Sequence, residues 1–286
     1  MSLDPRLFAV REDLADLTLR ARFRATRYAE GRPARVAVGL LPVLRAPQPE
    51  AALDTFFHYG EAVRIFDEAG GYAWCQSARD SYVGYVDAAA LSTGEGPKPT
   101  HHIASLGAYR YAEADLRSPA IDFLPRHAPV MVAQTGLECR GTPYVWLDGG
   151  GFLPERCLSA EPPRSPDLAA AASLYLGSPY LWGGRSFLGI DCSGLVQEAF
   201  RDLGVAVPRD TDMQCDTIGT PVVVLRPTDL YRNDLIYIPG HVMVCAGMGN
   251  VIHASGDDMT VRQDNLADLM RRWGYGFGDL KVRRPR

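Results

Sequence analysis

The chain has 286 residues, of which 47% are hydrophobic and 22% are charged, a composition typical of a globular protein with a substantial core. At about 100–200 residues per domain, this length favours two or three domains. The net charge of −4 gives no reason to expect nucleic acid or an anionic membrane surface as a partner.

The first 33 residues carry one short amphipathic stretch, Arg11–Arg20, and we assign residues 1–33 to an N-terminal helical segment. The longest apolar run near the start, Leu7–Val10, is shorter than the apolar core of a secretory signal. No segment approaches the roughly 18 apolar residues of a membrane-spanning helix. We therefore expect a cytoplasmic protein.

Two β-type blocks follow, at residues 34–93 and 101–160. Both contain short apolar runs separated by Gly and Pro, as strands joined by turns require. Each block ends with a cysteine in an extended run, an aromatic-rich turn, a glycine and a closing apolar strand. The sequence thus predicts a tandem of two small β-barrels joined by a Gly/Pro-rich connector.

The sequence pattern changes from short β-type runs to helical segments at residue 165, after a proline-rich connector. Asp167 is placed to cap a helix that Gly177 ends, and an amphipathic helix is predicted from Cys192 to Leu203. Apolar runs after Pro208 are compatible with strands. Residues 165–286 are therefore predicted to form an α+β domain.

The cysteines do not indicate a metal site or a disulfide framework. No two of the six lie within four residues of each other, which argues against zinc binding, and a cytosolic chain keeps its thiols reduced. We expect neither a metal nor an organic cofactor. The six are Cys75, Cys139, Cys157, Cys192, Cys215 and Cys245.

Cys192 differs from the others because a glycine-bearing loop delivers it to the first turn of a predicted helix. The unpaired N–H groups and dipole of a helix start favour negative charge, which predicts a thiol pKa below the free value of roughly 8.5. The alternative is that Cys192 simply packs at the helix start. Position alone does not separate a nucleophile from a packing residue.

Two histidines favour the catalytic interpretation. His241 opens an apolar run and His253 lies in the next one, an interval that fits two antiparallel strands joined by a tight turn at Gly247–Asn250. A cysteine nucleophile needs a base, and the base needs a polar group that orients it. Each histidine taken singly would more often be a satisfied core residue.

These segments resemble the NlpC family of bacterial cell-wall cysteine peptidases. The matching segments are residues 191–196, 240–242 and 252–254, with Tyr-x-Trp-Gly-Gly at 180–184 and Pro-Arg-Asp-Thr at 208–211. Over residues 165–286 the resemblance implies a papain-like fold. It also implies Cys192 as nucleophile, His241 as base, His253 as the orienting residue and Tyr180 as part of the oxyanion site. Asn233 stands where the family usually has glycine, in a turn away from the chemistry.

The family resemblance also implies a substrate. NlpC-type peptidases cleave between γ-D-glutamate and a diamino acid, diaminopimelate or lysine, in peptidoglycan stem peptides. A subgroup carries two SH3-like barrels before the catalytic domain, the first of which closes the cleft so that only a free N-terminal L-alanine fits. We expect small murein peptides as partners, a role in muropeptide recycling and a monomeric protein.

Candidate substrate-binding residues follow from the same resemblance. Glu61, helped by Asp210, is expected to bind the alanine amine, and Tyr82 to supply the steric wall. The residues expected to hold the glutamate carboxylate are Ser193, Arg209 and Thr211. The alternatives without a function are a solvated turn position for Glu61 and a surface ion pair between Arg209 and Asp210.

Asp191 needs a separate physical comment. A carboxylate beside Cys192 should raise the pKa of the thiol, so we expect Asp191 to point away from the sulfur and toward a cationic group of the substrate. Its alternative role is to cap the helix.

Two other functions stay open at the level of the sequence. The first is acyltransferase or amidase chemistry on the same fold, which uses the same Cys/His pair. The second is a catalytically dead protein that binds wall peptides through its SH3-like modules.

Overall fold

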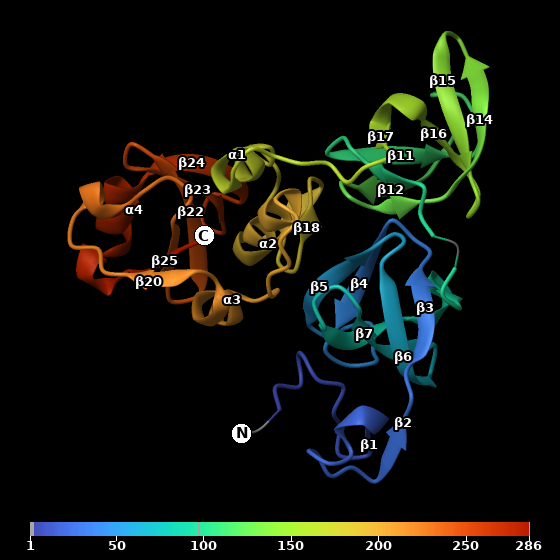
Figure 1. Ribbon diagram of the computed structural model, residues 1–286, viewed down its shortest axis with the longest axis horizontal. Helices are drawn as coiled ribbons and strands as arrows, with labels where there is room; N and C mark the ends of the chain where they lie inside the picture. The colour runs from blue at the N-terminus through green and yellow to red at the C-terminus, as the bar shows by residue number, and fades with distance from the viewer. Residues whose placement is uncertain (1–2, 97, 286) are drawn as a thin grey trace. The chain divides into compact units, whose positions relative to one another are not determined.

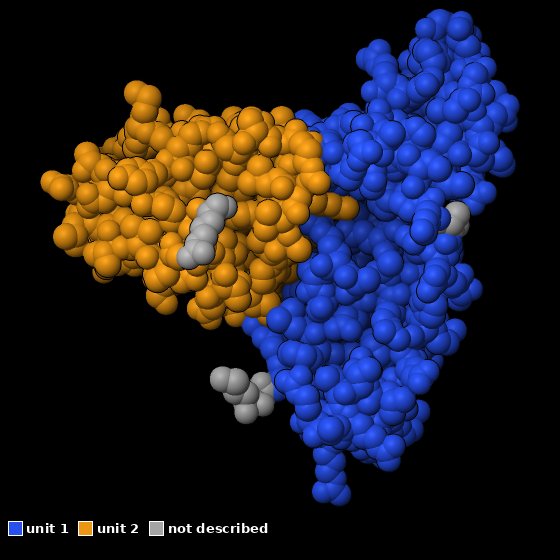
Figure 2. Space-filling model, viewed as in Figure 1, with its two compact units in different colours: residues 1–163 blue, residues 164–286 orange. Residues whose placement is uncertain are grey.

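The computed structural model describes residues 3–96 and 98–285, and the chain divides into two compact units, Met1–Pro163 and Arg164–Arg286 (Figure 2). In its described part, the first unit consists of strands and short 3₁₀ turns and contains no α-helix (Figure 1). The second unit contains helices and a six-stranded sheet. No helix in the described part of the chain is long and apolar enough to cross a membrane.

The N-terminal segment contains two short strands instead of the predicted helix. β1 (Leu14–Asp16) pairs in parallel with β2 (Arg27–Ala29), and a 3₁₀ turn follows β1 at Leu17–Leu19. The helical prediction for residues 1–33 is therefore wrong. An isolated helix shorter than about 12 residues is marginal in water, so tertiary pairing decides the conformation of this stretch.

A seven-stranded antiparallel sheet forms the first β domain, in the order β5-β4-β8-β7-β6-β3-β9. Its core contains fully buried apolar side chains such as Val43, Phe57 and Val86. The strands are β3 (Arg32–Val36), β4 (Leu40–Leu44), β5 (Leu53–His58), β6 (Ala62–Ala69), β7 (Tyr72–Ser77), β8 (Val83–Asp87) and β9 (Leu91–Thr93).

The second β domain has its own core, with Ile103, Leu124 and Leu153 fully buried. A three-stranded sheet, β13-β10-β17, accompanies a five-stranded sheet, β12-β11-β16-β15-β14. The strands are β10 (His101–Ile103), β11 (Gly107–Tyr111), β12 (Ala120–Pro125), β13 (Pro129–Val130), β14 (Val132–Cys139), β15 (Thr142–Leu147), β16 (Phe152–Pro154) and β17 (Leu158–Ser159).

The second unit is built on a six-stranded antiparallel sheet with the order β20-β25-β21-β22-β23-β24 (Figure 1). The strands are β20 (Thr220–Val222), β21 (Leu235–Ile238), β22 (His241–Gly247), β23 (Asn250–Ser255), β24 (Thr260–Asn265) and β25 (Lys281–Arg284). A small hairpin, β18 (Arg185–Ser186) with β19 (Gly189–Ile190), precedes the sheet in the chain.

Helices cover both faces of this sheet. Side chains of α1 (Leu168–Ser173) and α2 (Cys192–Asp202) share one hydrophobic core with one face, whereas those of α4 (Leu266–Trp273) share another with the opposite face. A fourth helix, α3 (Thr211–Thr217), follows α2. Because both faces of the sheet are covered, β22 is apolar almost continuously rather than alternating, as strands buried on two sides are.

The local signals in the sequence placed these helices well. The Asp167 carboxylate accepts a hydrogen bond from the Ala170 N–H at 2.7 Å and caps α1, which ends at Ser173, before the predicted stop at Gly177.

The turn between β22 and β23 has positive φ at both Met248 (54°) and Gly249 (76°). Two such residues form the two-residue hairpin turn whose twist matches the flanking strands.

Candidate active site

Cys192 is the first residue of α2, as the sequence predicts. The Asp191 carboxylate caps the helix by accepting a hydrogen bond from the Gly194 N–H at 2.7 Å. A Cβ at position 194 would lie 2.3 Å from the Gly184 carbonyl oxygen, so only glycine fits one turn into this helix. The sulfur lies 3.9 Å from the Thr211 hydroxyl, and the Cys192 side chain is almost fully buried.

Burial of Cys192 overturns the predicted direction of its thiol pKa. Loss of solvation, together with the charge of Asp191 that the sequence analysis considered, raises the pKa of Cys192 to about 11. Hydrogen bonds from the Val242 N–H and the Thr211 hydroxyl oppose the rise without cancelling it. The expectation of a thiol pKa below the free value is therefore wrong, because burial outweighs the helix start.

His241 and His253 meet as the sequence predicts. They lie on the neighbouring strands β22 and β23, and His241 Nε2 lies 2.9 Å from His253 Nδ1. Val244 pairs with Ile252, so the two histidines are diagonal neighbours across the hairpin. The indole of Trp273 packs edge-on against both rings, with centroids 5.7 Å from His241 and 5.9 Å from His253. The sequence analysis did not find Trp273.

A carboxylate extends this pair on the far side. His253 Nε2 lies 3.0 Å from Asp264 Oδ2, and Asp264 belongs to β24, the strand beside β23. The sequence analysis missed Asp264 because it did not identify β24. The alternation of buried Val261 with polar residues on either side is the signal that could have revealed this strand.

Both imidazoles are held neutral near pH 7. Burial lowers the pKa of His241, and the neighbouring His253 lowers it further. Burial also lowers the pKa of His253, although the hydrogen bond to Asp264 opposes that shift. With the thiol pKa raised, the resting site holds a protonated sulfur and a neutral base. His241 is therefore a neutral base with which to take the thiol proton.

This electrostatic arrangement predicts how the thiol reacts with iodoacetamide. Below its pKa of about 11, the thiolate fraction of Cys192 should rise about tenfold per pH unit. Site-resolved mass spectrometry should therefore show alkylation of Cys192 still accelerating between about pH 9 and 10, where an ordinary thiol of pKa about 8.5 has levelled off. Free cysteine in solution, alkylated in parallel, is the reference thiol. A rate that is constant from pH 7 upward would contradict the raised pKa.

Tyr180 lines a cavity of about 380 Å³ beside His241. Burial and the nearby charges of Cys192 and Asp191 raise the pKa of Tyr180 to about 12, so its hydroxyl keeps its proton and remains a hydrogen-bond donor. Asp257 also lines the cavity, and its carboxylate accepts a hydrogen bond from Trp273 Nε1 at 2.9 Å. The cavity thus combines a neutral donor with an anionic group beside the base.

Two segments of the chain match family models. Residues 177–273 match the NlpC/P60 family, and residues 43–91 match a bacterial dipeptidyl-peptidase SH3 domain. The crystal structure of an NlpC/P60 family protein from Bacillus cereus superposes with a TM-score of 0.70, covering 88% of this chain and 99% of that one at 19% identity. The second unit contains an NlpC/P60 domain.

The curated relatives align with this chain over only part of their own length. Dipeptidyl-peptidase 6 of Lysinibacillus sphaericus is 36% identical over 97 residues, which are 33% of this chain and 35% of that protein. The gamma-D-glutamyl-L-lysine dipeptidyl-peptidase of Bacillus cereus is 31% identical over 107 residues, 35% of this chain and 31% of that protein. The chain spans about a third of the length of these relatives. The fold is therefore α+β, with SH3-like and NlpC/P60 domains in that order.

Asp191 of the NlpC/P60 domain has a cationic partner in its own chain. Both carboxylate oxygens accept hydrogen bonds from Arg209, at 3.0 and 2.6 Å, and Oδ2 also accepts from the Gly183 N–H at 2.8 Å. The Asp191 carboxylate thus has a cationic partner and caps the helix, and its expected contact with a cationic substrate group stays a prediction. Arg209 is 1% exposed, so the surface ion pair considered for it is excluded.

The other candidate substrate contacts in the NlpC/P60 domain cluster around the nucleophile. Ser193 accepts a hydrogen bond from Arg209 at 2.8 Å, and Thr211 lies beside the Cys192 sulfur. Asp210 is the residue before α3 and is partly exposed. The structure therefore brings Ser193, Arg209 and Thr211 together, and their contacts with a substrate stay predictions.

Glu61 and Tyr82 belong to the SH3-like domain in the first unit. Glu61 is buried, pairs with Arg79 at 3.2 Å and accepts a hydrogen bond from the His58 N–H at 3.1 Å, so it is not a solvated turn residue. Tyr82 belongs to the hydrophobic core of its domain. Their roles in binding an alanine amine and in closing a cleft stay predictions.

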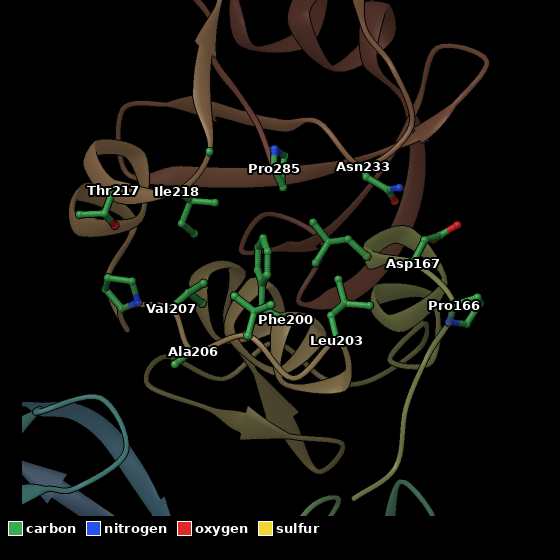
Figure 3. Close-up of a pocket in the computed structure, with 14 residues that line it drawn as sticks. Pro166, Asp167, Phe200, Leu203, Ala206, Val207, Thr217, Ile218, Asn233 and Pro285 are labelled. Atoms are coloured by element: carbon green, nitrogen blue, oxygen red, sulfur yellow. The ribbon is translucent and has the colours of Figure 1, made fainter.

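A larger cavity of about 650 Å³ lies elsewhere in the NlpC/P60 domain (Figure 3). Apolar side chains such as Phe200, Leu203 and Ile218 line it. Its one carboxylate, Asp167, is held by the α1 cap and by Arg232 at 2.9 Å. The residues that line this cavity include neither Cys192 nor His241, whereas His241 lines the smaller cavity. Within residues 3–96 and 98–285, no cluster of three or more His, Cys, Asp or Glu could hold a metal.

Proposed function

We propose that this chain is a cysteine peptidase that hydrolyses the bond between γ-D-glutamate and a diamino acid in peptidoglycan stem peptides with a free N-terminal L-alanine. The observation that carries the proposal is the 2.9 Å contact between His241 and His253, together with the Cys192 sulfur at a helix start, 4.0 Å from the carbonyl oxygen of Gly240, the residue before His241. The names of the curated relatives, dipeptidyl-peptidase 6 and gamma-D-glutamyl-L-lysine dipeptidyl-peptidase, support the substrate class.

The proposed reaction begins when His241 takes the thiol proton while the Cys192 sulfur attacks the γ-carbonyl carbon of D-glutamate. The carbonyl oxygen becomes an oxyanion, which the Tyr180 hydroxyl and the Cys192 backbone N–H stabilise as hydrogen-bond donors. His241 then gives its proton to the departing amine, and the C–N bond breaks. Water, deprotonated by His241, hydrolyses the thioester and releases the L-Ala-D-Glu dipeptide.

The cavity beside His241 supports a diamino acid as the leaving group. The departing amine must lie next to the residue that protonates it, which is His241. Asp257 puts a carboxylate in that cavity, and hydrogen bonds from Trp273 and Arg272 lower the pKa of Asp257. A second amino group on the leaving residue would share this carboxylate with Arg272, which lies 2.9 Å from Asp257 Oδ2. Diaminopimelate and lysine both carry such a group.

We place the reaction in cytoplasmic muropeptide recycling, by a monomeric enzyme. In the intact wall, the amine of L-alanine is acylated by the lactyl group of the glycan. A peptidase that requires this amine to be free therefore acts on released peptides. A carboxylate is the group that recognises a charged ammonium, and Glu61 of the first unit and Asp210 of the second are each predicted for this role.

Product analysis by mass spectrometry tests the proposal. Purified protein is incubated with L-Ala-γ-D-Glu-meso-diaminopimelate and, in parallel, with the same peptide capped by N-acetylmuramate. We expect release of L-Ala-D-Glu and free diaminopimelate from the uncapped peptide only. Faster cleavage of the capped peptide would contradict the free-amine requirement. Cleavage of neither would return the function to acyl transfer or to peptide binding without catalysis.

A further inference from the structure

Three side chains, His241, His253 and Asp264, form a hydrogen-bonded line that begins at the base, and the reaction described above assigns no step to the third. His241 Nε2 lies 2.9 Å from His253 Nδ1, and His253 Nε2 lies 3.0 Å from Asp264 Oδ2. We infer that Asp264 is a positioning residue that fixes the tautomers of both imidazoles, so that the base atom of His241 is Nδ1. This inference rests on the proposed function.

The tautomers follow from what each atom can donate. An ionised carboxylate accepts hydrogen bonds and donates none, so His253 must carry its proton on Nε2 to bond Asp264. A neutral imidazole has one proton, and therefore Nδ1 of His253 is an acceptor. His241 must then donate from Nε2 to His253. Its remaining nitrogen, Nδ1, keeps a lone pair with which to take the thiol proton of Cys192.

The bond between the two histidines does not select this arrangement by itself. If His253 carried its proton on Nδ1, the same 2.9 Å contact would form with His241 Nε2 as the acceptor. His241 would then carry its proton on Nδ1 and would have no lone pair for the thiol. The two arrangements share their heavy-atom geometry, so the choice between them is made at the other end of the line, by Asp264.

Asp264 also has a possible structural role, which a test must separate. Its Oδ2 lies 2.6 Å from Arg262 Nε, and Arg262 in turn pairs with Asp258 at 3.1 Å. Arg262 is 40% exposed, and exposed ion pairs contribute little to stability. If Asp264 served only to hold Arg262, removing Arg262 would have the same effect as removing the carboxylate.

Other charged groups around the histidines must be considered when a pH profile is interpreted. They come from β24, from the loop after β23, from α2 and from α4. These groups are Asp264, Arg262, Asp257, Asp258, Cys192, Arg272 and the partner imidazole of each histidine. Asp264 raises the pKa of His253 by its hydrogen bond and its charge. Its loss should therefore leave His253 harder to protonate.

The decisive variant is Asp264→Asn, which keeps the side-chain volume. Its amide can donate to His253 Nε2, so the carboxylate no longer excludes the second tautomer. We expect kcat for the tripeptide to fall about 100-fold. In a serine protease triad, where the carboxylate contacts the base directly, the same change costs about 10⁴-fold through the wrong tautomer. Arg262→Gln is the matched control and should change kcat less than about threefold.

A spectroscopic measurement makes the test independent of turnover. In protein with nitrogen-15 histidine, the ring-nitrogen chemical shifts report which nitrogen carries the proton. Wild-type protein and Arg262→Gln should show Nε2–H on both His241 and His253, and Asp264→Asn should show Nδ1–H on a large fraction of both. If Asp264→Asn fails to fold, Asp264→Glu, which keeps the carboxylate, should retain the wild-type tautomers.

The outcomes separate the inference from the proposed function. Wild-type tautomers and undiminished kcat in Asp264→Asn would overturn the inference, as would an equal loss of kcat in Arg262→Gln. Failure of the wild-type protein to cleave the tripeptide would overturn the proposed function instead. The tautomers in Asp264→Asn would still decide the role of Asp264 in that case.

Discussion

Replacing Cys192 with alanine should lower kcat for L-Ala-γ-D-Glu-meso-diaminopimelate by a factor on the order of 10⁶, as removal of a catalytic nucleophile does elsewhere. The reason is that the proposed acyl-enzyme forms on the Cys192 sulfur. Thr211 lies 3.9 Å from the sulfur but offers a hydroxyl whose proton is far harder to remove than that of a thiol. Product release followed by mass spectrometry is the measurement.

The same substitution should leave the protein folded. It removes one sulfur from a core that α1, α2 and the sheet share, and we expect a loss of about 1 kcal/mol in the free energy of unfolding. Cys215→Ala is the matched control, because Cys215 packs against the same core and has no role in the proposed reaction. More than about 1% residual turnover in Cys192→Ala would contradict the assignment of the nucleophile.

The largest stability effect is expected at Arg209. Arg209→Met removes the guanidinium that contacts both oxygens of Asp191, and it leaves a carboxylate that is only 9% exposed without its cation. Breaking a buried ion pair by removing one partner typically costs 3–5 kcal/mol. We therefore expect the free energy of unfolding, from urea denaturation at constant m-value, to fall by about that amount.

An exposed ion pair in the same domain provides the comparison. Arg232→Met breaks the pair with Asp167, whose side chains are 45% and 32% exposed, and it should cost less than about 1 kcal/mol. The double variant Asp191→Asn/Arg209→Met should recover part of the loss, since no buried charge is then unpaired. Equal losses at Arg209 and Arg232 would show that burial does not set the strength of this pair.

Local sequence signals were sufficient wherever a single element decided the structure. Asp191 and the glycine-bearing loop before Cys192 predicted a helix start that presents a thiol, and α2 begins at Cys192. The interval between His241 and His253 predicted a hairpin, and its turn falls where glycine permits positive φ. By contrast, the helical pattern of Arg11–Arg20 is too short to form a stable helix by itself, and part of this stretch pairs as β1 with β2 instead.

The sequence by itself determined the residues that can do the chemistry, because nucleophile, base and orienting histidine each lie on an element with its own local signal. Only the tertiary structure decided the protonation and tautomer states of these residues. The thiol pKa depends on burial among α1, α2 and the sheet, and the tautomer of His241 depends on Asp264 from a strand that the sequence analysis did not identify. The cation that pairs with Asp191 is Arg209, which likewise lies in a separate segment, beyond the end of α2. Solvation and hydrogen bonding across separate segments are properties of packing, which spacing along the chain does not encode.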